Sequence, residues 1–506
     1  MVRQFTNRIN QRSKYLPILF LAGITLWLRL VNLGYSDYQG DEIKALALPN
    51  PGQSFIDFLF QQKKGPIQFI VTYLIKLINP NYASEFLTRL PFALAGILAI
   101  FFFYKLVNLH FGSEIALYAS LFLTTNGLFV GLTRIVQYQP LVMLFSIAAL
   151  YAFSLAIAQE RWKVTGIYLG MVLWALALLT HYDGVFITPF AAFLLYRWYT
   201  ARSETANPSK IKHLVASGTL AGLMLASFYF PFLFSISTGT KDYLSFRLVT
   251  KQIQSGFSSS LVTFNLYNPI LVFYIYLLFG HLSLFKIKDT FPVVIWFLFP
   301  WEVLELAIFD PGTHIYTYLI PAAILVAFGV VVIEEAAVKT LGSGFGNLTS
   351  RSGLVLMFGF LALLSQFIFV DHTPEYPWEP RGFLLWTLQK PETKGDLWIF
   401  GFPYYRHWDE IGQFVTENDR YDYYATNEKT TIAVKYIPYT YDVNQSGYYI
   451  HIHNPQSFKD EIAQEKIRYW VKNYQPIKVF ENQGRVAAEI YEMPPGTIEE
   501  IKAAGY

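Results

Sequence analysis

The chain has 506 residues, of which 53% are hydrophobic, 18% aromatic and only 15% charged. Soluble globular proteins carry about 25% charged residues, so this composition indicates that lipid is the solvent for much of the chain. The net charge of +3 creates no overall field for a nucleic-acid partner. Cysteine is absent, which excludes disulfides, thiolate nucleophiles and cysteine-based metal sites.

The N-terminus is basic and continues into an apolar run from Tyr15 to about Leu33. This pattern is typical of a signal peptide, but no small-residue cleavage site follows, so we predict a retained first span. A helix needs about 20 apolar residues to cross a bilayer. Runs of this kind predict about eleven transmembrane helices, at 16–33, 88–108, 114–132, 136–158, 165–181, 184–199, 214–236, 264–284, 291–308, 315–333 and 353–370.

Lys and Arg in the short loops set the expected orientation, because they stay preferentially on the cytoplasmic side. With the basic N-terminus inside, the basic loops alternate along the whole chain. An odd number of spans then leaves everything after Val370 outside, together with the loops at 34–87, 181–184, 237–263 and 309–314. The chain lacks an organelle-type targeting segment, so the simplest expected location is a bacterial plasma membrane, with the active site on the non-cytoplasmic face.

Two segments outside the spans have their own character. In the first outer loop, 34–87, the apolar run at 67–78 is too short to span and predicts an interfacial helix, and 42–60 is expected to form another helix. The tail at 371–506 is rich in charge and turn signals and is large enough to fold alone. We expect residues 1–370 to form a transmembrane catalytic domain, and 371–506 a soluble extracytoplasmic mixed α/β domain with strands at 431–439 and 447–453 and helices near 457–473 and 494–503.

Asp41 and Glu42 lie side by side just beyond the first span, after Gly40. An isolated acidic pair is as often a solvated loop as a site. Here Gly40 lets the backbone turn, and the helical run that follows places the pair at a helix N-terminus, where a carboxylate is held rigidly.

Cations gather on the expected outer face, against the usual preference of Lys and Arg for the inside. They include Lys63 and Lys64, Arg89, Arg134 and Arg247. A lysine near a membrane is often only an interfacial anchor. A cationic face beside one acidic pair nevertheless suits an anionic ligand embedded in the membrane, such as a lipid phosphate.

Two polar helix ends are expected on the same face. His181, Tyr182 and Asp183 end the fifth predicted span, and His314 and Tyr316 begin the tenth. Each is more often an ordinary helix end when taken alone. Their coincidence with the acidic pair and the cations on one face favours a shared site, with these residues and Arg134 as candidate substrate contacts.

These motifs resemble those of the polyprenyl-phosphate-dependent glycosyltransferases of the GT-C superfamily, similar to the protein O-mannosyltransferases and the lipid A aminoarabinose transferases. The likeness covers about 16–336, and it is carried by the Arg29 to Gly34 span end, the Asp41–Glu42 pair, Lys64 to Pro66, and Arg89 with Pro91. The chain departs from the family at Gln139, where many relatives carry Asp, and Gln139 is therefore given no catalytic role.

The resemblance implies a membrane glycosyltransferase that moves a hexose or pentose from a polyprenyl-phosphate carrier to a lipid, polysaccharide or protein acceptor. Asp41 then corresponds to the essential carboxylate, acting as general base, and Glu42 to a residue that orients it. Lys64 corresponds to the lysine that contacts the donor phosphate, and Arg89, Lys63 and Arg247 are further phosphate ligands. Direct displacement would invert the anomeric centre. No cofactor is required by the sequence, although GT-C enzymes can hold a divalent metal on the acidic pair.

Other classes remain open from the residues alone. A polytopic transporter or lipid flippase would place ionisable residues near the bilayer midplane, where Glu302 and Glu305 are the best candidates, but the internal repeats typical of transporters are not visible. A receptor or assembly subunit that binds through its tail is the other alternative.

His451 and His453 share one face of a predicted strand, but the sequence shows no third ligand at a suitable distance, so we expect no metal site there.

Overall fold

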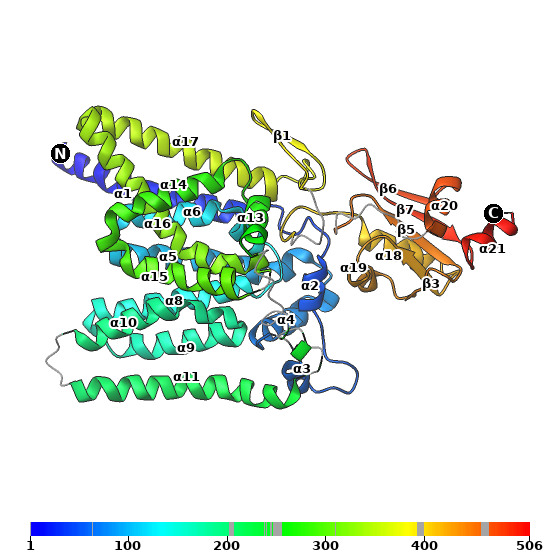
Figure 1. The fold of residues 1–506 in the computed structure, drawn as a ribbon, viewed down its shortest axis with the longest axis horizontal. Coiled ribbons are helices and arrows are strands. Elements are labelled where there is room, and N and C mark those ends of the chain that lie inside the picture. Colours follow the sequence, from blue (N-terminus) through cyan, green and yellow to red (C-terminus); the bar gives the residue numbers. More distant parts are fainter. Residues whose placement is uncertain are drawn as a thin grey trace.

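A computed structural model describes residues 2–62, 64–201, 207–236, 238, 240–242, 245, 256–308, 310–391, 399–456 and 465–505. Figure 1 shows a bundle of long helices, from which the N-terminus emerges, and a smaller part with a β-sheet that carries the C-terminus. The short helices α2, α3 and α4 lie at the end of the bundle that faces the sheet. The two parts therefore meet at the first outer loop.

The bundle is built of helices that run roughly along its long axis (Figure 1). The central helix is α16, which contacts α6, α14, α15 and α17 and is buried all round from Tyr316 to Val330, as expected for a helix that is apolar on every face. The helices and their short connecting turns are α1 (Val2–Leu30), α5 (Glu85–Phe111), α6 (Ser113–Thr125), α7 (Gly127–Leu132), α8 (Gln139–Ala158), η2 (Glu160–Trp162), α9 (Thr165–Thr180), η3 (Tyr182–Ile187), α10 (Thr188–Thr200), α11 (Asn207–Ser235), α13 (Gly256–Tyr267), α14 (Val272–Leu282), η4 (Ser283–Lys286), α15 (Ile287–Glu302), η5 (Val303–Ala307), η6 (Gly312–Ile315), α16 (Tyr316–Leu341) and α17 (Ser343–Phe369).

Within the described residues, six helical segments are long and apolar enough to cross a membrane, which supports an integral membrane protein. They are Glu85–Phe111, Gln139–Ala158, Ser209–Ser235, Val272–Ala307, Gly312–Leu341 and Ser343–Phe369. The first predicted span, 16–33, falls mostly on the apolar second half of α1, and others fall on shorter or interrupted helices, such as α6 with α7 and η3 with α10. The count of eleven spans and their orientation stay predictions.

The first outer loop contains α2 (Gly40–Ala45), α3 (Phe55–Phe60), α4 (Ile67–Ile78) and the short turn η1 (Pro80–Tyr82). The predicted helix at 67–78 is present as α4. The single helix expected at 42–60 is wrong, because α2 ends at Ala45 and Pro49 and Pro51 interrupt the run. Proline removes a backbone donor and disfavours helical geometry in the residue before it.

After α17 the chain forms a hairpin of β1 (Arg381–Phe383) and β2 (Trp386–Leu388), and then a five-stranded sheet in the order β4-β3-β5-β7-β6. In this sheet β3 runs parallel to β4 and β5, and β7 runs antiparallel to β5 and β6. The elements are α18 (Trp408–Glu417), β3 (Tyr423–Thr426), α19 (Thr430–Tyr436), β4 (Thr440–Tyr441), β5 (Gly447–Ile452), α20 (Glu465–Asn473), β6 (Lys478–Asn482), β7 (Arg485–Met493) and α21 (Ile498–Ala503). A mixed α/β tail is thus confirmed.

Of the two predicted strands in the tail, 447–453 is present as β5, whereas 431–439 is wrong because it contains α19. Ile432, Ala433 and Ile437 are buried together in the core of the sheet part. Ile437 lies four residues after Ala433 and five after Ile432, which places the three on one helical face, and a short apolar run of this kind does not by itself distinguish a helix from a strand. The predicted helices appear as α20 and α21, and 457–464 lies outside the described residues.

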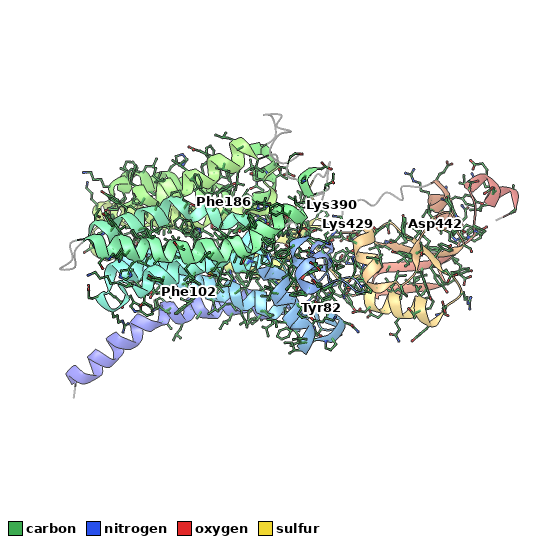
Figure 2. The ribbon with its side chains drawn as sticks, turned by 90° about the horizontal axis from the view of Figure 1, so that it is seen from below. Tyr82, Phe102, Phe186, Lys390, Lys429 and Asp442 are labelled. Carbon is green, nitrogen blue, oxygen red and sulfur yellow. The ribbon has the colours of Figure 1, made fainter. Side chains whose placement is uncertain are left out.

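The sheet part docks on the segment between α1 and α2. Figure 2 shows Tyr82, from the first outer loop, and Lys429, from the sheet part, near this junction, and Phe102 and Phe186 within the bundle. The Asp37 backbone N–H donates to the Tyr404 carbonyl at 2.8 Å, and the Arg406 N–H donates to the Asp37 carboxyl at 2.6 Å. The segment that leads to Asp41 is therefore held by the backbone of residues 404–406.

Candidate functional site

Glu42 is a fully buried carboxylate on α2 whose oxygens are both occupied. Oε1 accepts hydrogen bonds from Arg89 Nε at 2.8 Å and from the Val136 backbone at 2.9 Å. Oε2 accepts from Arg89 Nη2 at 2.8 Å and from the Gln39 backbone at 2.9 Å. A bidentate charged pair of this kind fixes the orientation of α2 as well as neutralising the carboxylate.

All five N–H groups of Arg89 are engaged with protein acceptors. Besides the two bonds to Glu42, it donates at 2.9 to 3.2 Å to the backbone carbonyls of Leu33, Ser36 and Asp37. A guanidinium has five N–H donors and no acceptor, so this set uses its whole capacity. Arg89 therefore has no free donor for a phosphate oxygen, contrary to the role expected from the sequence.

Asp41, the neighbour of Glu42, has a different environment. Its side chain is 26% exposed, whereas that of Glu42 is 0% exposed, and one oxygen pairs with Lys44 Nζ at 3.0 Å. The preceding Gly40 lies against the sheet part, where an added Cβ would be 2.9 Å from Thr431 Oγ1. The pair is thus divided into one buried, locked carboxylate and one carboxylate that other molecules can reach.

Lys64 lies at the end of α9, because Gly65 lets the chain pass so closely that an added Cβ would be 1.8 Å from the Leu179 carbonyl. Its Nζ is 4.2 Å from the centre of the Tyr138 ring and 3.5 Å from Gln137 Oε1. Burial lowers the pKa of Lys64 to about 8, and the negative charges of Asp41 and Asp183 oppose that shift. Lys64 is thus a partly desolvated cation with two carboxylates in its field.

Next to Lys64, three side chains from two helix ends form a polar cluster, His181–Asp183–His314. The Asp183 carboxylate lies 3.1 Å from His181 Nδ1 and 2.8 Å from His314 Nδ1. His181 and Asp183 are almost completely buried, while the His314 side chain is 13% exposed. Burial alone would raise the pKa of Asp183, but the two imidazoles outweigh it and hold that pKa below its ordinary value.

Aromatic rings link Lys64 to this cluster. The Tyr138 ring, which Lys64 faces, stacks on His181 with centroids 3.9 Å apart, and the exposed Tyr182 ring lies 3.7 Å from His181. Tyr316 is buried and lines the same small internal space as Asp183. Tyr138 and Gln137 were not among the sequence candidates, and their only signal is a short polar and aromatic run at the start of the predicted span 136–158.

The remaining candidates lie apart or are not described. Arg134 is 5% exposed and donates to the Leu28 carbonyl at 2.9 Å, so it faces α1 and supports the bundle. Gln139 is buried and its Nε2 lies 3.5 Å from Thr313 Oγ1. Lys63 and Arg247 lie outside the described residues.

The sequence of residues 64–229 matches the model of the dolichyl-phosphate-mannose-protein mannosyltransferase family. Among curated proteins, none matches the chain significantly. Solved structures do match: the oligosaccharyltransferase AglB from Archaeoglobus fulgidus, in complex with an inhibitory peptide and a dolichol-phosphate, is 11% identical with a TM-score of 0.50, and the match covers 87% of this chain and 70% of that one.

Two further solved structures also match. ArnT from Cupriavidus metallidurans is 10% identical with a TM-score of 0.49, and the match covers 96% of this chain and 98% of that one. The Archaeoglobus fulgidus oligosaccharyltransferase tethered with an acceptor peptide is 13% identical with a TM-score of 0.47; the match covers 85% of this chain but spans only 64% of that one. The resemblance drawn from the motifs is confirmed: the chain has the GT-C fold of glycosyltransferases that use polyprenyl-phosphate donors, and its segment 64–229 matches the dolichyl-phosphate-mannose-protein mannosyltransferase family.

Proposed function

We propose that this protein transfers a sugar from a polyprenyl-phosphate donor to an acceptor, with inversion at the anomeric carbon. The observation that carries the proposal is a reachable carboxylate, Asp41, and a partly desolvated cation, Lys64, in each other's field at one end of the bundle. The match of 64–229 to a family of mannosyltransferases supports the same reaction class.

In the proposed reaction Asp41 accepts the proton of an acceptor hydroxyl or amine. The acceptor atom forms a bond to the anomeric carbon while the bond from that carbon to the phosphate oxygen breaks, and polyprenyl phosphate leaves. Lys64 binds the phosphate and offsets its growing negative charge, which acts mainly as electrostatic stabilisation of the transition state. A charge-assisted hydrogen bond of this kind is worth about 1.5 to 3 kcal/mol.

Glu42 and Arg89 have a positioning role, because they hold the helix that carries Asp41. Their buried pair holds α2, and α2 places the partly exposed Asp41 in the electrostatic field of Lys64. Glu42 thereby keeps the orienting role expected from the sequence, and Arg89 takes a supporting role in place of phosphate binding.

The same geometry bears on where a divalent metal would bind. The oxygens of Glu42 already accept four hydrogen bonds, so the Asp41–Glu42 pair does not fit an ion. The His181–Asp183–His314 cluster fits better, because its ligand atoms lie within 4.8 Å of one another and imidazole with carboxylate suits zinc-like ions. A cation bound there would add positive charge beside Lys64.

The direct test is an assay of purified protein with synthetic polyprenyl-phosphate sugars and membrane extracts as the source of acceptor. We expect release of polyprenyl phosphate that depends on acceptor, and a product of inverted anomeric configuration by NMR. Analysis of envelope glycans with and without the protein would then name the sugar. Release of an unmodified donor on the opposite side of a vesicle, with no transfer, would favour a flippase instead.

The proposal also places the site and residues 371–506 on the non-cytoplasmic face. A reporter enzyme that is active only in the cytoplasm, fused after Tyr506, should therefore be silent. The same reporter fused between the predicted spans 184–199 and 214–236 should be active and serves as the control. A strong signal from the C-terminal fusion would mean that the orientation is inverted.

A further inference from the structure

Two histidines and a glutamate meet on one face of the C-terminal sheet, far along the chain from the site described above. His451 lies on β5 and His453 directly follows its last residue, Ile452, and the two imidazole rings lie side by side with centroids 4.6 Å apart. The antiparallel register places Glu489 of β7 directly opposite His451. The sequence alone showed no acidic residue near this pair, because Glu489 is separated from it by 36 residues and only strand pairing brings it there.

The donor atoms of the three residues converge. Glu489 Oε2 lies 3.3 Å from His451 Nδ1 and 3.0 Å from His453 Nε2, and all three ligand atoms lie within 4.8 Å of one another. In a tetrahedral zinc site with metal–ligand bonds of about 2.0 to 2.1 Å, neighbouring donor atoms are about 3.3 Å apart. The two separations from Glu489 Oε2, 3.3 and 3.0 Å, are close to the edge length of such a site.

The surroundings of these three residues favour a preorganised metal site over a chance contact on the surface. The side chains of His451 and Glu489 are only 15% and 18% exposed, and that of His453 is 40% exposed. The Tyr491 hydroxyl donates to the same Glu489 oxygen at 3.2 Å. Ligands of metal sites are commonly oriented by such outer hydrogen bonds. The paired strands β5 and β7 supply His451 and Glu489, and His453, just after β5, is held against β7 by its backbone N–H, which donates to the Ala487 carbonyl at 3.0 Å, so little needs to move when an ion binds.

We propose that His451, His453 and Glu489 form a divalent metal site of the zinc class, with a fourth position open to solvent beside His453. Mixed imidazole and carboxylate ligands favour Zn²⁺ and its neighbours over Mg²⁺ or Ca²⁺, which prefer oxygen alone. This site is separate from the His181–Asp183–His314 cluster and does not depend on the proposed transferase reaction.

The position of the site indicates what the ion would do. The backbone carbonyl of His453 accepts a hydrogen bond from Arg406 Nε at 2.8 Å, and Arg406 also holds Asp37 at the junction with the bundle. An ion that links β5 to β7 therefore stiffens the strand end on which the junction is built. We expect Zn²⁺ to raise the thermal unfolding midpoint of the sheet part and to protect the junction from proteolysis.

The test uses the full chain in detergent, stripped with a chelator and titrated with Zn²⁺ by calorimetry, with bound metal measured after dialysis. The variants are His453→Ala and Glu489→Gln, the second of which keeps the shape of the side chain. His407→Ala is the matched control, because His407 pairs with a single carboxylate, Glu410, at 3.3 Å. All four proteins are compared in a His314→Ala background as well, which removes a ligand of the other cluster.

We expect the parent and His407→Ala to bind one more equivalent of Zn²⁺ than His453→Ala and Glu489→Gln, in both backgrounds. Loss of an outer partner costs a metal site 10- to 100-fold in affinity, so loss of a ligand should cost about 100-fold or more. In the His314→Ala background, Co²⁺ should give the visible absorption bands of a tetrahedral site in the parent and His407→Ala, but not in His453→Ala or Glu489→Gln. Equal stoichiometry and affinity in the parent, His453→Ala and Glu489→Gln would show a hydrogen-bonded surface cluster and overturn the proposal.

Discussion

At the scale of single residues, the proposed mechanism depends on Asp41 being the general base and not a structural carboxylate. Replacing it by Asn keeps its shape and hydrogen bonding but removes its ability to take a proton. We expect turnover to fall by about 10² to 10⁴ while the protein still folds, because general base catalysis contributes that much. Steady-state kinetics of purified Asp41→Asn gives the result.

Asp57→Asn is the matched control, since Asp57 is an exposed aspartate of the same loop, in the first turn of α3, whose carboxylate accepts a hydrogen bond from the N-cap Ser54 at 2.6 Å. It should leave turnover unchanged. An Asp41→Asn protein that works at close to the parental rate would end the assignment of Asp41 as base.

The lowered pKa of Lys64 predicts an upper pH limit for activity. Its pKa is lowered to about 8 by burial, so its charge is complete below that value and is lost as the pH rises through it. In the free enzyme, kcat/KM for the donor should therefore decline above about pH 8. Lys64→Arg should move this decline to higher pH, because Arg stays charged, and Lys64→Ala should raise the donor KM at every pH.

Lys76→Ala, a change in the same outer loop, should leave the pH profile as it is. If Lys64→Arg and the parent lose activity over the same pH range, another group sets the limit and Lys64 is not the phosphate ligand.

At the scale of elements, α2 depends on one buried ion pair. Removal of one partner leaves the other charge uncompensated in the interior, which costs about 3 to 5 kcal/mol. Glu42→Gln and Arg89→Ala should each lower the free energy of unfolding by that amount, measured by denaturant unfolding in detergent. Turnover of folded Glu42→Gln should fall less than that of Asp41→Asn if Glu42 only orients α2.

Lys286→Ala provides the comparison, because Lys286 pairs with Glu335 at 2.8 Å on the surface. An exposed pair is worth at most about 1 kcal/mol. Similar losses for Lys286→Ala and Glu42→Gln would mean that the Arg89 pair is no more important than a surface contact.

At the scale of the whole molecule, the junction between the bundle and the sheet part contains a buried acid. Burial raises the pKa of Asp37 to about 8, although the Arg406 backbone N–H draws it down. The folded protein then binds one proton more than the unfolded chain between about pH 4 and 8, so stability falls as the pH rises across this window. The slope is at most about 1.4 kcal/mol per pH unit for one proton.

Asp37→Asn keeps an oxygen for the Arg406 N–H but has no proton to lose, so the variant should lack this part of the slope. Thermal unfolding of both proteins from pH 5 to 9 gives the difference. Parallel curves for the two proteins would show that Asp37 is already ionised, or exposed, in the folded state.

The sequence by itself determined what depends on local composition and spacing. Its apolar runs predicted the helical bundle, its charge-rich tail predicted the mixed α/β part, and the motifs from Arg29 to Pro91 predicted the GT-C fold. These features can be predicted from the sequence because each apolar segment and each short motif is a contiguous stretch of the chain.

Only the tertiary structure decided which partner each charged side chain contacts. Glu42 differs from its neighbour Asp41 because it pairs with Arg89, 47 residues away. Arg89 also donates to the carbonyls of Leu33, Ser36 and Asp37. His453 meets Glu489 in the same way, across a long separation in sequence. The short run at 431–439 likewise became a helix because its apolar residues face the sheet core. A single sequence does not encode which of several buried partners a charge will find, since that choice is made by packing and by the cost of leaving a buried charge unpaired.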